Sequence, residues 1–331
     1  MVLARHRPPC YNQKKKQMGD GHMAYYGKTG GIIAAASKRD AVPLLQVGSI
    51  PIIRRLVIVL QQAGVFPLVI VTGTEEAEVI HQLAQYGVIF LRNRQCDAPE
   101  LLDSVKLGLR FLRDKCDRVV FTPVNTPMFS PETLRAVLAC DAPIVTPSYH
   151  GKSGHPIVLR NDALDTVLTY SGENGLRGAL ASAPALRRWT EVEDRGILLS
   201  VHDQQQLREH LKEHNRSLLS PTIQVGIEKE GVFFNSRLKL LLFLIADLSS
   251  VRQACFHMGL SPAKAWGMLN QLEQEVGYAV IDRQHGGSRG GRTTLTPRGL
   301  ALVRAYQQYE DLLHSYAHDT FTRMFRDSGL I

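Results

Sequence analysis

The stretch that decides the fold runs from Gly31-Ile-Ile-Ala-Ala-Ala36 to Leu68-Val-Ile-Val-Thr72. Both runs are short and apolar, which is typical of buried strands. Residues 50–64 between them have a helical pattern, with Pro51 near the first turn and Gly64 as the C-terminal stop. The stretch therefore predicts a strand–helix–strand unit of an α/β domain.

The same alternation continues to residue 146. Helices are predicted at residues 75–86, at 99–112 and from Pro131 onward, and strands at 88–91, 118–122 and 142–146. This repetition predicts a mostly parallel, Rossmann-like sheet that is covered on both faces. Because ligands in such sheets sit beyond the carboxyl ends of the strands, a site is expected around residues 36–42, 72–74 and 123–126.

Length and composition favour two domains. The chain has 331 residues, a hydrophobic fraction of 44% and a formal net charge of +8, and the positive charge favours anionic partners such as nucleotides or nucleic acid. The predicted organisation is a basic flexible tail (1–29), the α/β domain (30–214), a linker (215–232) and a smaller second domain (233–325).

The lack of an evident signal peptide and the pattern of cysteines predict a cytoplasmic protein. The basic residues of 1–29 suit either a solvated tail or an arm that touches nucleic acid, and no apolar core of signal-peptide length follows them. The longest apolar run, residues 238–248, is too short to span a bilayer. The five cysteines are scattered and form no C-x-x-C pair, which fits reduced thiols.

Ordered motifs from residue 31 to residue 199 carry a family resemblance. They are the Ala-Ala-rich end of the first strand, Pro43–Pro51, Asp103–Leu109, Pro123-Val-Asn-Thr-Pro127, Ser130–Glu132, Gly154-His-Pro-Ile-Val158, Gly172-Glu-Asn-Gly175 and Gly196–Leu199. In this order they resemble the molybdenum-cofactor cytidylyl- and guanylyltransferases. The resemblance implies a nucleotidyltransferase fold that binds a nucleotide and a pterin-type substrate.

The first loop departs from the family pattern. Ala36 stands where the family has a Gly, and Val42 replaces a Lys that would meet phosphate charge. Lys38 and Arg39 remain as candidate phosphate contacts.

The metal positions depart as well. The family holds Mg²⁺ with two aspartates, where this chain has Asn125 and the run Ser200-Val-His202. Mg²⁺ prefers charged oxygen ligands, so no metal site is expected unless Asp203, one residue further on, replaces the lost ligand. Losing these carboxylates should cost many orders of magnitude in rate, which predicts a domain that keeps a pocket without nucleotidyl transfer.

The expected ligand pocket is lined by residues from these loops. They are Ala36, Lys38, Arg39, Thr72, Ser104, Asn125 and His155. Ser104 either faces a nucleobase or is a buried hydrogen-bonded serine, and we expect His155 to shape the pocket rather than act as a base. The pairs His210/His214 and His314/His318 have metal-ligand spacing, but a solvated polar face is the commoner explanation and is expected here.

The second domain has the pattern of a helix-turn-helix. A helix is predicted at 235–247, and Ser249-Ser250 caps another at 251–258. Gly259 makes the turn, and Ser261-Pro262 starts a third helix. Predicted strands at 278–283 and 293–296 flank a basic, glycine-rich loop, so a winged helix-turn-helix that enters the major groove is expected.

This region resembles LysR-type regulators, and the molybdate-responsive ModE type more closely. The carrying motifs are Gly259–Trp266, Leu269–Glu273, Gly286-Gly-Ser-Arg-Gly-Gly291 and Leu295–Gly299. The expected DNA-contacting residues are Ser261, Ala263, Lys264, Gly267, Asn270, Gln271, Arg283, Arg289, Arg292 and Arg298. Trp266 either packs against the first helix or contacts a base.

The tail from residue 300 to 325 is predicted as a long amphipathic helix. It either forms a homodimer, which places two recognition helices on two half-sites, or packs against its own transferase-like domain. Together these features predict a regulator that binds double-stranded DNA and senses a nucleotide or molybdopterin-type ligand, without a resident cofactor. The alternative is a bifunctional, Mg²⁺-dependent nucleotidyltransferase that carries a DNA-binding domain.

Overall fold

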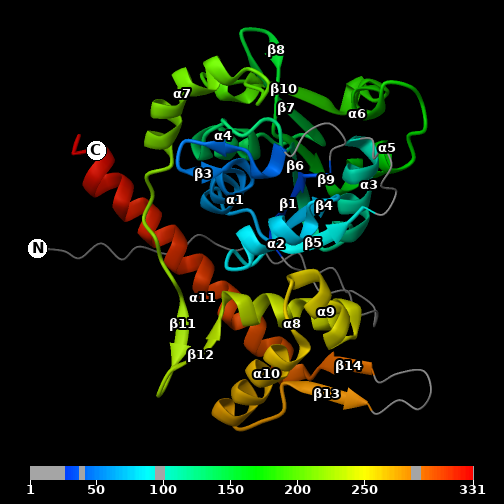
Figure 1. Cartoon of the computed structure of the whole chain (residues 1–331), viewed down its shortest axis with the longest axis vertical. Helices are drawn as coiled ribbons and strands as arrows, with labels where there is room; N and C mark the ends of the chain where they lie inside the picture. The colour runs from blue at the N-terminus through cyan, green and yellow to red at the C-terminus, as the bar shows by residue number, and fades with distance from the viewer. Residues whose placement is uncertain (1–26, 37–41, 94–100, 285–291, 331) are drawn as a thin grey trace, which may run out of the picture.

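The computed structural model describes residues 27–36, 42–93, 101–284 and 292–330. The N-terminal part is built on a mixed, mostly parallel sheet in the order β10-β7-β9-β6-β1-β4-β5, with β8 paired to β7 (Figure 1). The strands are β1 Gly27–Ala34, β4 Leu68–Thr72, β5 Ile89–Arg92, β6 Cys116–Pro123, β7 Ile144–Tyr149, β8 Lys152–Ser153, β9 Ile157–Arg160 and β10 Arg187–Glu191. The predicted α/β fold with a mostly parallel sheet is confirmed.

Helices cover both faces of this sheet. Neighbouring residues of one strand serve opposite faces, since Ile32 and Ile33 belong to different buried clusters. One face is covered by α3 Leu101–Leu112, α5 Leu164–Leu168 and α6 Gly175–Ala181. The other is covered by α1 Ile52–Gln62, α2 Glu76–Leu83, α4 Pro131–Ala139 and α7 Gln204–Ser217.

One detail of the sequence prediction was wrong. The helix expected from residue 50 begins at Ile52, because Pro51 has extended backbone and Ile50–Pro51 forms β3, which pairs with β2 Gln46–Val47. Strand β9, which was not predicted from the sequence, runs antiparallel to both β6 and β7 within the mostly parallel sheet.

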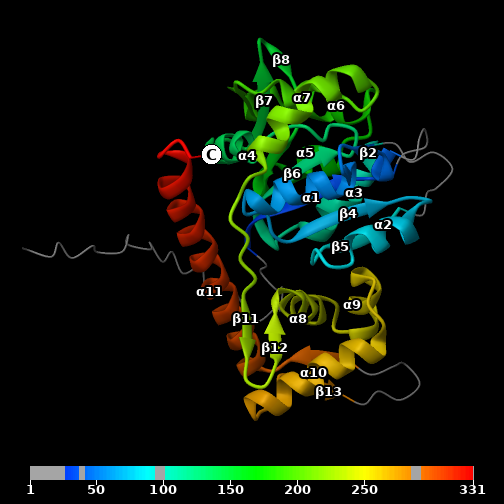
Figure 2. The ribbon, with the colours of Figure 1, turned by 60° about the vertical axis from the view of Figure 1, so that its left-hand side comes forward.

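The described C-terminal part contains three consecutive helices, two strand pairs and a long helix (Figure 2). The elements are β11 Gly226–Glu228, β12 Val232–Asn235, α8 Ser236–Leu248, α9 Val251–Met258, α10 Pro262–Val276, β13 Ile281–Gln284, β14 Arg292–Leu295 and α11 Pro297–Phe321. A single π-helical turn, Thr322–Arg326, follows α11. The final helix starts earlier than expected because the Thr296 hydroxyl caps it by accepting from the Gly299 amide.

The two parts share one continuous apolar core. A single buried cluster contains Ile32 and Leu109 of the sheet domain together with Leu242 and Leu269 of the C-terminal helices. Phe66, which precedes β4, lies 6.1 Å from Phe243 of α8 between ring centroids. Helices α8 and α9 therefore pack directly on the sheet domain.

Candidate functional site

The carboxyl ends of the parallel strands form one edge of the sheet. The backbone amide of Val124 donates to Ala34 O at 3.0 Å, and that of Asn93 donates to Thr72 O at 3.0 Å. The loops that follow β1, β4, β5 and β6 are thus joined side by side, as the sequence predicts for a ligand-binding edge.

Asn125 and the 200–202 segment meet at this edge. The Val201 amide donates to Asn125 O at 3.0 Å, which brings together the two positions where the resembling transferases hold Mg²⁺. Asn125 is half-buried and His202 is exposed. Among the described residues, no group of three or more His, Cys, Asp or Glu side chains is placed to hold a metal ion. The neutral side chain of Asn125 can supply only a carbonyl oxygen.

Several predicted pocket residues are buried within the fold. The Thr72 hydroxyl lies 3.2 Å from Glu76 Oε1 and 3.4 Å from Leu91 O. Ser104 is fully buried and accepts from Asn93 Nδ2 at 3.4 Å, which agrees with the buried alternative for this serine. Ala36 is buried against Gly73, whereas Lys38 and Arg39 lie outside the described residues. A ligand role for these residues stays a prediction.

His155 lies beside a cavity of about 450 Å³. Its backbone amide donates to Ile197 O at 3.0 Å, and its ring meets the Phe121 ring edge-on at 5.7 Å. Burial lowers the pKa of His155 to about 4, so the imidazole is neutral near pH 7. Its Nδ1 atom is buried and has no hydrogen-bond partner within the described residues. A ligand in the cavity would supply that partner.

The walls of this cavity carry positive charge. The described residues that line it include Arg177 of α6 and Arg187 of β10, and no carboxylate. Arg187 Nε donates to Thr146 Oγ1 at 3.0 Å, and its guanidinium stacks 3.9 Å from the centroid of the Trp189 ring. Such a lining suits an anionic ligand, for example one that carries phosphate. Sequence reasoning missed both arginines, although the Gly172–Gly175 motif directly precedes Arg177.

Two glycines allow the loops around His155 to approach each other. A Cβ on Gly154 would lie 2.3 Å from Ile197 O, and one on Gly196 would lie 2.0 Å from Met128 O. Any side chain at either position would push these loops apart. The glycines of the two family motifs therefore position His155.

The third C-terminal helix exposes a polar face. Gly259, with φ of +57°, makes the turn, and Ser261 caps α10 by accepting from the Lys264 amide. Ala265, Leu269 and Leu272 are buried on the inner side. The predicted DNA-contacting residues of this helix are all exposed, namely Ser261, Ala263, Lys264, Gly267, Asn270 and Gln271.

The strand pair β13–β14 lies beside this face. Arg283 Nη2 donates to Asn270 Oδ1 at 2.9 Å and to Glu273 Oε2 at 2.8 Å, which fixes the strand to α10. Its guanidinium also lies 5.1 Å from the centroid of the half-buried Trp266 ring, which packs on the core. Arg292 and Arg298 are exposed, and Arg289 lies outside the described residues.

One expectation about the histidines was wrong. His214 does not lie on a solvated face, because its side chain is 2% exposed. His210 Nδ1 lies 3.2 Å from Glu213 Oε2.

No described helix is long and apolar enough to cross a membrane.

The N-terminal domain belongs by fold to the α/β nucleotidyltransferase-like class. Residues 41–189 match the family described as MobA-like NTP transferase domain, so this part of the chain is such a domain. Among solved structures, the chain is similar to a nucleotidyl transferase from Methanothermobacter (21% identity, TM-score 0.49, 56% of this chain and 98% of the other). It is also similar to Rv0371c of Mycobacterium tuberculosis H37Rv (19% identity, TM-score 0.47, 55% and 98%).

Curated relatives match a shorter part of the chain. The DNA-binding transcriptional dual regulator ModE of Escherichia coli K12 is 29% identical over 102 residues, which are 31% of this chain and 37% of ModE. The molybdenum-pterin-binding protein MopB of Rhodobacter capsulatus is 30% identical over 86 residues, 26% of this chain and 32% of MopB. The chain thus spans about a third of the length of these relatives.

Proposed function

We propose that this protein is a DNA-binding transcription regulator whose NTP-transferase-like domain senses a ligand. The exposed polar face of α10 carries this proposal, since six predicted DNA-contacting residues share it while the opposite side is buried. In this proposal α9 and α10 form the helix-turn-helix, and β13–β14 forms the wing. In this proposal the tail is residues 1–29, the sensor is 30–214, the linker is 215–232 and the DNA-binding domain is 233–325.

The proposed sensor has lost catalysis. Mg²⁺-dependent transfer needs carboxylates at the positions of Asn125 and His202. The hydrogen bond from Val201 N to Asn125 O holds the two loops together, but neither residue supplies a carboxylate. The cavity beside His155 is retained, and Arg177 and Arg187 favour an anionic ligand. The name of ModE supports DNA binding, and the name of MopB supports molybdenum or molybdopterin metabolism as the regulated process.

The junction between the parts supports communication from sensor to DNA-binding domain. Lys115, the residue before β6, lies 3.0 Å from Asp247 of α8, and both side chains are about one tenth exposed. A Cβ on Gly259, the helix-turn-helix turn, would lie 2.5 Å from Ile80 of α2. The turn before the proposed recognition helix therefore touches the sensor.

Nucleotide titration tests the sensor. We expect the full-length protein to bind CTP, GTP or ATP without Mg²⁺, or to bind none of them, in calorimetric titrations with and without the metal. The variant N125D/H202D restores both carboxylates and is expected to gain Mg²⁺ dependence. Binding by the unmodified protein that requires Mg²⁺, followed by pyrophosphate release with a pterin substrate, would contradict the loss of catalysis.

The second candidate is a bifunctional enzyme, an active molybdenum-cofactor nucleotidyltransferase with a DNA-binding domain. The family match over residues 41–189 and the retained His155 cavity favour it. The same titration separates the two candidates.

A further inference from the structure

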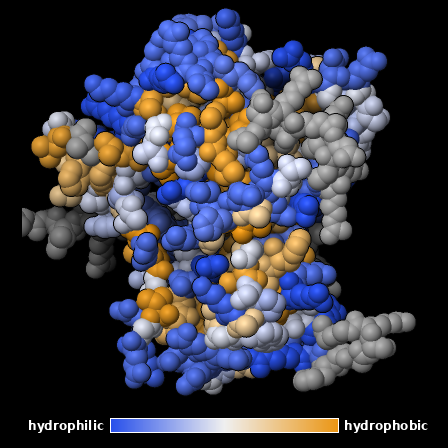
Figure 3. Space-filling view, in the orientation of Figure 1, coloured by the Kyte–Doolittle hydropathy of each residue, from blue (hydrophilic) through white to orange (hydrophobic). Residues whose placement is uncertain are grey.

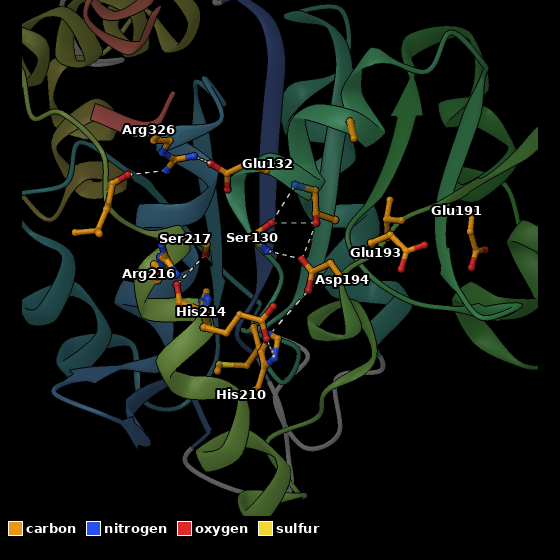
Figure 4. A pocket seen from close by; sticks show the side chains of 16 residues that line it. Ser130, Glu132, Glu191, Glu193, Asp194, His210, His214, Arg216, Ser217 and Arg326 are labelled. Atoms are coloured by element: carbon orange, nitrogen blue, oxygen red, sulfur yellow. Dashed lines mark hydrogen bonds and ion pairs between the residues drawn. The ribbon is translucent and has the colours of Figure 1, made fainter. Parts of the chain in front are cut away.

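A second cavity of about 700 Å³ shares none of its described lining residues with the cavity beside His155 (Figure 4). It is bounded by α4, by α7 and by the segment 191–194, which begins at the last residue of β10. Arg326, at the end of the chain's last helical turn, also lines it. Its residues Met128 and Ser130 lie on the segment that follows β6, and residues 191–194 lie at the carboxyl end of β10.

The lining of this cavity is acidic. It contains the carboxylates of Glu132, Glu191, Glu193, Asp194 and Glu213, and only two arginines, Arg216 and Arg326. Glu132 is paired with Arg326 and with Arg135. The remaining four carboxylates therefore face a single lining arginine, Arg216.

These carboxylates divide into two kinds. Asp194 is structural, since it accepts from the amides of Ser130 and Gly196 and from the Thr133 hydroxyl at 2.6 to 2.8 Å. Glu191 is likewise engaged, by the Ser148 hydroxyl and the His150 amide. In contrast, within the described part of the chain Glu213 has an ion-pair contact with His210 alone, and Glu193 makes no hydrogen bond or ion pair there. Glu193 and Glu213 are both exposed and available to a ligand.

A buried, unpartnered histidine also lines the cavity. His214 is 2% exposed, and neither ring nitrogen has a partner among the described residues. Burial, together with the nearby Arg55 and His210, lowers the pKa of His214 to about 3, so its imidazole is neutral. A neutral imidazole offers one donor and one acceptor, and buried polar atoms of this kind are normally paired. Glu132 Oε2 is a second buried acceptor that has no partner in the described ranges of the chain.

Aliphatic side chains fill the space between the charged groups. Met128, Ala136, Val192 and Leu219 are part of the same lining. In Figure 4, Ser130 and Glu132 of the α4 side lie across the cavity from His210 and His214 of α7. A ligand must therefore be cationic at more than one point and apolar between those points.

We propose that this cavity binds an aliphatic polyamine. Its ammonium groups would pair with Glu193 and Glu213 and donate to His214, while its methylene groups would contact the aliphatic wall. A metal ion fits less well, because no metal-binding cluster exists among the described residues. Since Arg326 pairs with Glu132 and donates to Leu219 O at 2.8 Å, the ligand would also touch the end of the C-terminal helical segment.

The test is calorimetric titration of the full-length protein with spermidine at low ionic strength. We expect one spermidine per chain, and roughly tenfold weaker binding by E193Q/E213Q, which removes the two available carboxylates. The matched control is E209Q/E228Q, which removes two exposed carboxylates outside the cavity and should bind as the unmodified protein does.

A second measurement keeps the test independent of variant folding. Spermidine should shift the His214 ring-nitrogen resonances of the unmodified protein and leave those of His202 unchanged. Absence of spermidine binding would overturn the proposal. Equal weakening in both double variants, or equally strong competition by Mg²⁺, would also overturn it, because either result would reduce the cavity to a general acidic surface.

Discussion

The imidazole Nδ1 of His257 lies 2.8 Å from the carbonyl oxygen of Phe90. This contact joins α9 to β5, the last strand of the large sheet, whose outer edge has no neighbouring strand in the sheet order. Helix α9 therefore packs along an edge that would otherwise expose backbone polar groups. Asn93, three residues after Phe90, bonds to Thr72 and Ser104 at the candidate ligand edge, so β5 physically links that edge to α9.

Removing this contact should loosen β5. In H257A we expect the amides of β5 and α9 to exchange hydrogen about fivefold faster, because a hydrogen bond contributes about 1 kcal/mol net. Hydrogen-exchange mass spectrometry measures this. Q253A, an exposed position on the same helix, is the control, and equal protection in both variants would refute the link.

The exposed face of α10 should control DNA affinity through charge. K264A is expected to weaken binding to unrelated duplexes and to lower the slope of log affinity against log salt by about 0.9. Fluorescence anisotropy at several salt concentrations measures the slope. K212A removes an exposed charge from α7 and should leave the slope unchanged; a shared effect would point to net charge alone.

The outer face of α11 should form a homodimer. Leu312 and Tyr316 are each 70% exposed, and Figure 3 shows apolar side chains gathered where the end of this helix lies in Figure 1. Leu312 and Tyr316 are four residues apart and so are neighbours on one face of the helix, and adjacent exposed apolar side chains mark interaction sites. L312D/Y316D should sediment as a monomer at concentrations where the unmodified protein sediments as a dimer. A monomeric unmodified protein would exclude this interface.

Two buried histidines should make the protein acid-sensitive. Their pKa values in the folded state, about 4 for His155 and about 3 for His214, lie below the ordinary value of 6.5. Between pH 6.5 and these values the unfolded chain binds more protons, so the free energy of unfolding falls as the pH falls. Each histidine contributes a slope of about 1.4 kcal/mol per pH unit at most. Urea unfolding of H155Q across this range should show a shallower slope.

The buried pair Lys239–Glu310 ties α8 to α11. Lys239 is 2% exposed, and its ammonium group also lies 3.8 Å from the centroid of the Phe66 ring in the sheet domain. K239M should lower the free energy of unfolding by about 3 kcal/mol, because it leaves a buried carboxylate without its cation. K239M/E310M should recover much of that loss. Equal destabilisation of both variants in denaturant titrations would contradict this assignment.

Local sequence patterns predicted the strands and helices whose apolar runs are continuous. Strand β10, with the sequence Arg-Arg-Trp-Thr-Glu, has no such run, because it lies at the exposed end of the sheet order. The antiparallel direction of β9 depends on its partners β6 and β7, which its own residues do not encode.

The candidate sites were predictable to different degrees. The face of α10 follows from helical periodicity and its cap, whereas the Arg177–Arg187 cavity depends on bringing β10 beside α6. His214 looked solvated because its helix is polar. Arg55, which lies near it, is 159 positions earlier in the chain and bonds to Asn215, so only tertiary structure reveals the burial.

The shared core has a consequence for synthesis on the ribosome. A nascent chain that has completed α7 has made the whole sheet, but Phe66 and Phe111 still lack the α8 and α9 side chains that pack on them. The sheet domain therefore carries an uncovered apolar strip until those helices emerge. An mRNA truncated between the two coding segments should yield a product that depends on chaperones.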